Sequence, residues 1–253
     1  MKVSLITTTF NSEKTLEDTI LSVIKQSYYN IEYIIIDGFS KDNTLKIIDK
    51  YRYRIDVVLS EPDSGIYDAL NKGIKLATGD VIGIIHSDDV YSHCNVLSKV
   101  VEHFEYFPNS DMIIGDVSFF KGTNTDSVVR FYSSRYFSSW QMRFGFMPAH
   151  PATFVKRAVY DNLGYYSLEY KIAADFEWFL RSLVVNNVKY TKLSMVLVKM
   201  RIGGISTAGI KNNLLISSEM LNALRSNNLL SSYFFVSLRL PIKLALKYFS
   251  FFR

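Results

Sequence analysis

Acidic side chains follow several apolar runs of the sequence, in positions that suit the binding of a cation. Asp37 ends a run of isoleucines, Glu61 follows residues 55–60, and Asp88 and Asp89 follow the apolar run before them. Paired carboxylates can hold Mg²⁺ or Mn²⁺ and leave coordination positions open for phosphate oxygens and water. Such an acidic lining suits a phosphorylated ligand only when a divalent cation lies between the charges. The sequence therefore predicts a metal-dependent site.

Alternating strand-like and helix-like segments must position these acids. The expected strands are Val3–Thr9, Tyr33–Asp37, Ile55–Ser60, Asp80–His86 and Asp111–Phe120. The expected helices are Thr15–Gln26, Asn43–Tyr51, Ile66–Ala77, Asn95–Phe107 and Ala174–Leu183. This alternation predicts an α/β fold, a mainly parallel central sheet flanked by helices on both faces. Ligands of such sheets bind beyond the carboxyl ends of the strands, where Thr9 and the acids lie.

The composition fits one large domain. The chain has 253 residues, of which 48% are hydrophobic and 15% aromatic, so it can bury a sizeable core. Because no repeat or low-complexity linker divides it, we expect one domain over residues 1–225 and a C-terminal helical tail over residues 226–253. The single cysteine, Cys94, excludes an intrachain disulfide. The first residues lack the order of a signal peptide, and no run reaches the ~20 apolar residues of a membrane span, so we expect a cytoplasmic protein.

Charge and glycine patterns exclude other classes of ligand. The net charge is +5, and the segment after the last acid, Glu219, carries this excess. Its cations are Arg225, Arg239, Lys243, Lys247 and Arg253. The rest of the chain is balanced, so no nucleic acid partner is expected. Neither GxGxxG nor GxxxxGK[ST] occurs, which disfavours a dinucleotide-binding turn and a P-loop.

Several blocks, taken together, resemble family 2 of the inverting glycosyltransferases, which have the GT-A fold. They are Val3–Asn11, Ile36–Thr44, Ser60–Gly73, Ala77–Asp80 and His86–Asp89. Each block alone is a weak signal, but their order along the chain is specific to the family, and a looser likeness extends to about Arg201. The resemblance implies an enzyme that moves a sugar from a nucleotide-diphosphate sugar, above all a UDP-sugar, to an acceptor hydroxyl with inversion.

The resemblance also implies roles for residues on the donor side. The nucleotide-binding set would be Thr7, Thr9, Asp37, Asp68, Lys72 and Asp88. Asp89 would hold the divalent metal, Mn²⁺ or Mg²⁺. Each assignment has a structural alternative. Asp37 could stabilise an Asx turn, although that role suits Asp42 better, and the Asp88–Asp89 pair could cap the next helix. Asp68 and Lys72 lie four positions apart on a predicted helix, where they could instead form a surface ion pair.

On the acceptor side, Asp175 matches the family's general base, which draws the proton from the attacking hydroxyl. The family more often has Glu where this chain has Ala174, so a possible helper is missing. Glu177 is the rival base and a possible acceptor or phosphate contact, but two positions later on a helix it points to another side. His150 opens a His-Pro-Ala-Thr-Phe segment seen in bacterial members that handle surface polysaccharides. His150 could contact the acceptor or a phosphate, or it could have a structural role.

Other residues near these blocks have less specific patterns. Arg201 precedes the glycine pair Gly203 and Gly204, which could close over the diphosphate as a lid or form a plain turn. His86 and His93 flank the paired acids at a spacing that is not typical of metal ligands, so packing or surface roles are expected. No Gln-x-x-Arg-Trp block occurs, so the chain does not resemble a processive synthase. One sugar per binding event is therefore expected.

In the tail, Arg239, Lys243 and Lys247 lie four apart and would share one helical face. This pattern predicts a helix on an anionic membrane surface, with a terminal helix packed on the domain as the alternative. Membrane contact on the inner face would suit a lipid-linked saccharide acceptor in bacterial surface polysaccharide synthesis, whether O-antigen, capsule or exopolysaccharide.

Two other classes of function compete with glycosyl transfer. A nucleotidyltransferase would need a phosphate-gripping loop near the first strand, and Thr7–Asn11 offers none. A catalytically silent sugar-nucleotide-binding or membrane scaffold protein would not need Asp88, Asp89 and Asp175 together.

Overall fold

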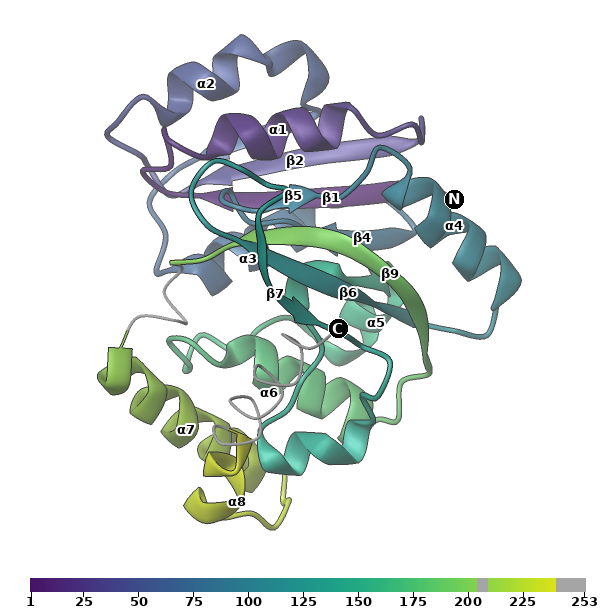
Figure 1. The fold of residues 1–253 in the computed structure, drawn as a ribbon, viewed down its shortest axis with the longest axis vertical. Coiled ribbons are helices and arrows are strands. Elements are labelled where there is room, and N and C mark those ends of the chain that lie inside the picture. The colour runs from purple at the N-terminus through teal and green to yellow at the C-terminus, as the bar shows by residue number, and fades with distance from the viewer. Residues whose placement is uncertain (204–208, 240–253) are drawn as a thin grey trace.

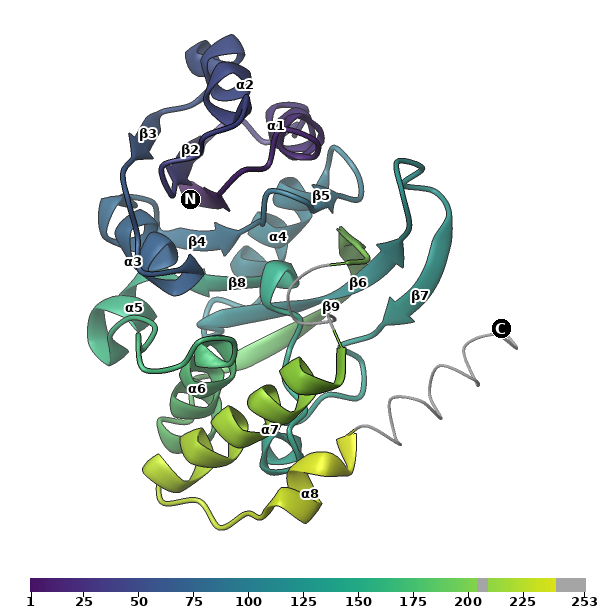
Figure 2. The ribbon, with the colours of Figure 1, turned by 90° about the vertical axis from the view of Figure 1, so that its left-hand side faces the viewer.

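The computed structural model describes residues 1–203 and 209–239, in which the strands form one mixed sheet of nine strands with helices on both faces (Figures 1 and 2). The strand order is β3-β2-β1-β4-β8-β6-β9-β5, and β7 pairs with β6 at the side. The predicted α/β class is confirmed. The sheet is less uniformly parallel than predicted, because β8 enters its centre in the antiparallel direction.

The first four strands make a parallel half. They are β1 (Val3–Thr9), β2 (Ile31–Asp37), β3 (Val57–Ser60) and β4 (Val81–Ile84). All seven residues of β1 are buried, as expected of a parallel strand covered on both faces. The second half has β5 (Val90–Tyr91), β6 (Met112–Phe120), β7 (Val128–Tyr132), β8 (Thr153–Lys156) and β9 (Tyr190–Arg201). There β6 and β9 run parallel to each other, while β5 is antiparallel to β9.

Helices cover the two faces of the sheet and enclose two cores. The α-helices are α1 (Leu16–Ile24), α2 (Thr44–Lys50), α3 (Ile66–Leu76), α4 (Val96–Tyr106), α5 (Arg157–Leu163), α6 (Ala174–Leu180), α7 (Gly209–Ser226) and α8 (Tyr233–Ser237). Short helical turns are η1 (Arg52–Arg54), η2 (Ser139–Phe144), η3 (His150–Ala152) and the π-turn η4 (Arg181–Val185). Residues of α1, α2 and α4 form one core, including Phe104. Those of α3, α5, α6, α7 and α8 contribute to the other, around Trp178.

A close seam joins the two halves of the sheet. β4 pairs with β8, with Gly83 opposite Phe154. A Cβ atom added to Gly83 would lie 2.5 Å from Cε1 of Phe154, so only glycine lets the ring lie this close. Because the pair is antiparallel, the carboxyl end of β4 lies beside the start of β8 and the preceding turn η3. The seam thus brings the segment after β4 next to His150.

The C-terminal part packs beneath α6 and η2. α7 packs on α6, and α8 packs on α7 and η2, at the lower end of the molecule in Figures 1 and 2. Arg239 is 3% exposed and donates to Ser217 Oγ at 3.1 Å, so it faces α7 and not the outside, unlike the outward basic stripe predicted for it. Lys243 and Lys247 lie outside the described residues. Among the described helices, none is long and apolar enough to span a bilayer.

Candidate active site

The paired acids lie in a tight turn after β4. The amide of Asp89 donates to the carbonyl of His86 at 3.0 Å, which folds the turn inward. Asp89 is 2% exposed; its Oδ1 accepts a hydrogen bond from the Arg201 amide at 3.3 Å, and its Oδ2 has no partner in the part of the chain described. Burial, with the nearby charge of Asp88, raises the pKa of Asp89 well above its usual range. A buried carboxylate oxygen of this kind calls for a proton or a cation.

The donor chemistry of the pair fits a divalent cation. Asp88 is half-buried and accepts no hydrogen bond from the described residues, so both carboxylates have free oxygens. No group of three or more His, Cys, Asp or Glu side chains in residues 1–203 and 209–239 is arranged as a metal site. A cation held here would therefore take its remaining ligands from water or from a bound diphosphate. Carboxylate, phosphate and water oxygens are the ligands that Mg²⁺ and Mn²⁺ prefer.

The two flanking histidines differ in setting. The ring of His86 lies 5.6 Å from that of His150, and burial lowers the pKa of His86. His93 is exposed, and its carbonyl accepts a hydrogen bond from the Gln26 amide at 2.8 Å. His86 thus packs inside the protein and His93 lies on its surface, in agreement with the expected roles.

Arg201 ends β9 and is brought to Asp89 by the pairing of β9 with β5. Its side chain turns away to Asp18 Oδ2 at 3.1 Å and to the carbonyl of Gly122, and its guanidinium carbon lies 4.7 Å from the centre of the Phe120 ring. Both terminal nitrogens of the guanidinium thus bind protein groups, while Nε is buried without a partner among the described residues. Gly204, part of the predicted lid, lies outside the described residues.

Asp175, the predicted base, lies in the first turn of α6. Its Oδ1 accepts the amide of Phe176 at 2.7 Å and lies 3.2 Å from the Tyr67 hydroxyl, which also donates to the Ile172 carbonyl at 2.5 Å. Its Oδ2 accepts no hydrogen bond from any described residue. Burial raises the pKa of Asp175 to about 6. A carboxylate held by one oxygen, with the other free and a pKa near neutrality, has the properties of a general base.

Glu177, the rival acid, faces elsewhere. Its carboxylate binds Arg181 at 3.0 and 3.3 Å. Arg181 also donates to the carbonyls of Leu163 and Tyr165, so the ion pair ties α6 to the segment after α5. The structure therefore turns Glu177 away from Asp175, and its carboxylate forms a partly buried ion pair in place of an acceptor or phosphate contact.

Aromatic rings connect the acids after β4 with Asp175. His150 Nε2 lies 2.7 Å from the Tyr166 hydroxyl, and its ring contacts His86. The rings of Tyr166 and Tyr67 lie 5.8 Å apart, and Tyr67 reaches Asp175. Burial, then the neighbouring His86, lowers the pKa of His150 to about 3, so this imidazole stays neutral. These contacts connect the turn that carries the paired acids to Asp175 through His150, Tyr166 and Tyr67.

Two polar residues that the sequence did not single out hold this site in shape. Glu219 of α7 accepts hydrogen bonds at 2.9 Å from the amides of residues 171, 172 and 173, which lie two to four positions before Asp175. Asn71 of α3 binds the amide and carbonyl of Tyr166 at 2.9 and 2.8 Å. Both partners are far away in the sequence, so no local pattern could reveal either role.

Asp37 is buried and occupied. One oxygen accepts from Ser40 Oγ at 2.5 Å, and the other from the Ser40 amide at 3.0 Å and Ser60 Oγ at 2.6 Å. This arrangement is the turn-stabilising alternative and leaves no exposed oxygen for a nucleoside, since Asp37 is 0% exposed. Asp42 closes the Asx turn predicted for it, accepting the Thr44 amide at 3.0 Å.

The other predicted nucleotide-binding residues are partly occupied by the protein. Thr7 is fully buried, with its hydroxyl 3.2 Å from that of Tyr33. Thr9 is also buried, but its Oγ1 has no partner among the described residues. Lys72 binds Glu61 at 2.8 Å and lies 3.7 Å from Asp68, which corresponds to the ion-pair alternative. Among the predicted nucleotide-binding residues, Asp88 lies beside Asp89, and its carboxylate accepts no hydrogen bond from the described residues.

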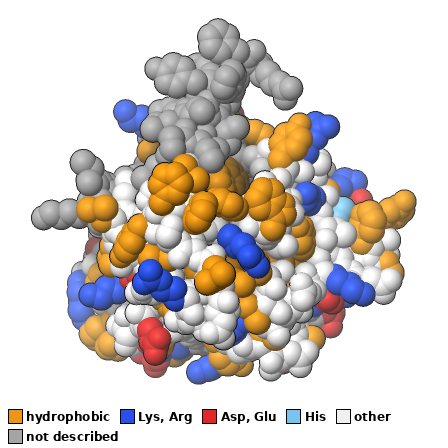
Figure 3. Space-filling model, turned by 90° about the horizontal axis from the view of Figure 1, so that it is seen from below, with side chains coloured by type: hydrophobic (Ala, Val, Ile, Leu, Met, Phe, Trp, Pro, Cys, Tyr) orange, Lys and Arg blue, Asp and Glu red, His pale blue; other side chains and the backbone are white. Residues whose placement is uncertain are grey.

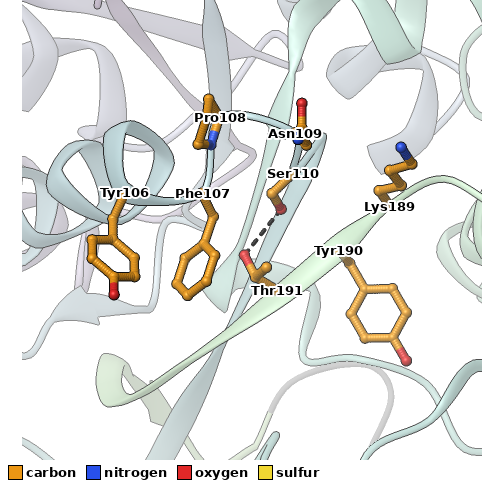
Figure 4. Close-up of a pocket in the computed structure, with 8 residues that line it drawn as sticks. All are labelled: Tyr106, Phe107, Pro108, Asn109, Ser110, Lys189, Tyr190 and Thr191. Carbon is orange, nitrogen blue, oxygen red and sulfur yellow. Dashed lines mark hydrogen bonds between the residues drawn. The ribbon is translucent and has the colours of Figure 1, made fainter.

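A separate cavity of about 370 Å³ lies at the other end of β6 (Figure 4). Tyr106, Phe107 and Lys189 line it, beside a hydrogen-bonded pair of hydroxyls, Ser110 and Thr191, whose oxygens are 2.9 Å apart. β6 starts near this pair and ends beside Arg201, and at about 3.3 Å per residue its length separates the two sites by roughly 25–30 Å. The cavity is not part of the candidate site.

The chain is similar to known glycosyltransferases. The model of the family described as glycosyl transferase family 2 matches residues 4–163. An uncharacterized glycosyltransferase of Mycobacterium tuberculosis is 33% identical over 192 residues, 72% of this chain and 69% of that protein. A PGL/p-HBAD biosynthesis glycosyltransferase of Mycobacterium bovis is 28% identical over 181 residues, 70% of this chain and 68% of that protein.

Solved structures share the fold. Staphylococcus aureus TarS 1–349 in complex with UDP-GlcNAc has a TM-score of 0.68 at 22% identity, over 88% of this chain and 67% of that one. The match covers 44% of the longer TarS structure. The mannosyltransferase PcManGT of Pyrobaculum calidifontis, in complex with GDP-Man and Mn²⁺, has a TM-score of 0.65 at 16% identity, over 89% of this chain and 63% of that one.

The family match extends over more than half of the chain and contains β1 to β4, the turn with the paired acids, and His150. The strand order, the site geometry and this match lead to one conclusion. The chain belongs to glycosyltransferase family 2 and is a transferase with the GT-A fold.

Proposed function

We propose that this enzyme transfers one sugar per binding event from a nucleotide-diphosphate sugar, in the first place a UDP-sugar, to an acceptor hydroxyl with inversion. The observation that carries the proposal is the setting of Asp175. One of its oxygens is held by Phe176 and Tyr67, the other is free, and burial raises its pKa to about 6. Asp175 is thus ready to accept a proton from a neutral hydroxyl near pH 7.

In this reaction Asp175 Oδ2 takes the acceptor proton as the acceptor oxygen attacks the anomeric carbon. A new bond from carbon to the acceptor oxygen forms as the bond to the diphosphate oxygen breaks, and the nucleoside diphosphate leaves with the electron pair. Attack from the face opposite the leaving group inverts the anomeric carbon. His150 is neutral and hydrogen-bonded to Tyr166, so it would offer a hydrogen bond near the reacting groups but would not act as an acid.

The donor is proposed to bind beyond the carboxyl ends of β1 and β4. Asp89 would hold Mn²⁺ or Mg²⁺ and Asp88 would contact the ribose, in line with their free oxygens. Such a cation, when bound, neutralises the charge that grows on the departing diphosphate. TarS bound to UDP-GlcNAc and PcManGT bound to GDP-Man and Mn²⁺ support a nucleotide sugar and a metal in this fold. Thr9 also has a free buried hydroxyl at this edge.

The acceptor is proposed to be a lipid-linked saccharide in bacterial surface polysaccharide synthesis, reached from the inner face of the membrane. What supports this is the basic, acid-free sequence after Glu219 and the His150 segment. Residues 226–253 would make the membrane contact.

The direct test measures release of nucleoside diphosphate and of glycosylated product. UDP- and GDP-sugars are offered with Mn²⁺, with Mg²⁺ or with a chelator, after a thermal-shift screen selects the donors that stabilise the protein. We expect turnover with at least one UDP-sugar, loss with the chelator, and a product of inverted configuration. If no nucleotide sugar is bound or hydrolysed, a scaffold function replaces this proposal.

A further inference from the structure

Exposed aromatic side chains gather at the end of the molecule formed by η2 and α8. We call this surface, made of residues 135–144 and 230–235, the end face. Its most exposed members are Leu230 (92%), Tyr136 (73%), Phe234 (69%) and Trp140 (59%). Figure 3 looks at the molecule from this end, where hydrophobic side chains cluster with Lys and Arg among them. Exposed apolar patches of this kind mark interaction sites.

The end face has a defined structure. The Trp140 ring meets Phe144 edge-on at 5.8 Å, and Phe144 meets Phe235 at 5.6 Å. Ser231 Oγ donates to the carbonyl of Arg143 at 3.1 Å and ties α8 to η2. Val236, fully buried, anchors α8, while Tyr233 and Phe234 beside it are exposed.

The two segments that make the end face, residues 135–144 and 230–235, carry cations and no acids. The longer segments that contain them, residues 127–160 and 220–239, also have no Asp or Glu. Arg135 and Arg143 are exposed on the face. Aromatic rings with cations and without acids complement the headgroup region of an anionic bilayer, where rings enter the interface and cations meet phosphate.

From this surface we propose that the end face docks on an anionic lipid bilayer, with Trp140 and Phe234 inserted at the headgroup level and Arg135 and Arg143 on lipid phosphates. The inference extends the proposed membrane location but rests on described residues and not on residues 240–253. α7 leads from this face to Glu219, which holds the segment before Asp175, so docking here also orients the acceptor side of the enzyme toward the membrane.

Fluorescence of the full chain tests the proposal, because its two tryptophans are Trp140 on the end face and Trp178, which is 0% exposed. With vesicles of phosphatidylcholine and about 30% phosphatidylglycerol, Trp140 emission should shift to shorter wavelength, and brominated lipid should quench it. Trp140→Phe should abolish both signals and retain binding. Binding without shift or quenching would overturn the proposal and point to another surface.

Co-sedimentation with the same vesicles gives a second measurement. Trp140→Ser with Phe234→Ser should weaken binding tenfold or more. Arg135→Gln with Arg143→Gln should weaken it about tenfold on anionic vesicles only. Matched controls are Tyr53→Ser, also an exposed aromatic residue (79%), and Lys14→Gln with Lys46→Gln, exposed cations of the opposite end. Equal loss in the controls would refute the assignment, as would a dimer in sedimentation whose formation the Trp140→Ser pair abolishes.

The failure of this inference is separable from failure of the proposed function. Donor hydrolysis without vesicles should be unchanged in all end-face variants, since none touches Asp175 or the paired acids. A protein that hydrolyses donor but does not bind vesicles contradicts only the docking proposal.

Discussion

The pKa of Asp175 predicts how turnover depends on pH. A general base must be deprotonated, and with a pKa of about 6 the active form falls from about nine in ten molecules at pH 7 to about one in ten at pH 5. The rate should thus rise about tenfold over this range and level off above it. The assay is kcat at saturating donor and Mn²⁺, so that protonation of Asp89 does not contribute. Asp175→Asn should lower turnover ~10²–10⁴-fold, leave donor affinity nearly unchanged and remove the pH dependence.

Tyr67→Phe sharpens the test. The Tyr67 hydroxyl lowers the pKa of Asp175, so its removal should move the inflection to higher pH. A profile that stays flat down to pH 5, or an inflection that Tyr67→Phe leaves in place, would refute the assignment of the base.

The same pKa has a consequence for stability. Because the folded-state pKa of Asp175 is raised from 3.8 to about 6, the native state retains a proton that the unfolded chain has released in that interval. The free energy of unfolding is therefore highest below about pH 4, as far as Asp175 is concerned, and this contribution is lost as pH rises through 6. Asp175→Asn should recover up to ~3 kcal/mol at pH 7 and little at pH 4, as measured by urea unfolding. Equal effects at both pH values would contradict burial as the cause.

Three further predictions concern the neighbouring acids. Asp89→Ala should abolish Mn²⁺-dependent UDP binding in calorimetry and leave the circular dichroism spectrum intact; undiminished binding would exclude Asp89 as the metal ligand. Glu219→Gln keeps one acceptor oxygen for three amide donors, so urea unfolding should show a loss of roughly 2–4 kcal/mol, with kcat reduced more than donor affinity. Glu177→Gln should change turnover only a few-fold because Glu177 pairs with Arg181; a loss as large as that of Asp175→Asn would transfer the base role to Glu177.

Buried parallel strands could be predicted from the sequence because their signal is local. β2 and β4 are rich in isoleucine and valine, β1 begins with a short apolar run, and the acids after β4 follow the end of that strand. β8 and β9 were not predicted. β8 has four residues, and β9 alternates weakly because most of its residues are half-buried. These strands depend on their partners in the sheet and not on their own pattern.

The site divides in the same way. Asp175 and the paired acids are predicted from their place in recognisable blocks, and their roles stay predictions. The occupation of Asp37 by Ser60, 23 positions away, could not, since it depends on the pairing of β2 with β3. Glu219 needs the packing of α7 on α6 before its three amide partners come within reach.

The seam between Gly83 and Phe154 has a consequence for folding during synthesis. β4 is an interior strand only when β8 covers it, and all four of its residues are buried in the finished sheet. Until residue 156 has left the ribosome, β4 presents an apolar, unpaired edge, and sheet edges of this kind recruit other chains. We expect the nascent chain to depend on chaperones over this interval of synthesis, and a chain that ends before Thr153 to aggregate.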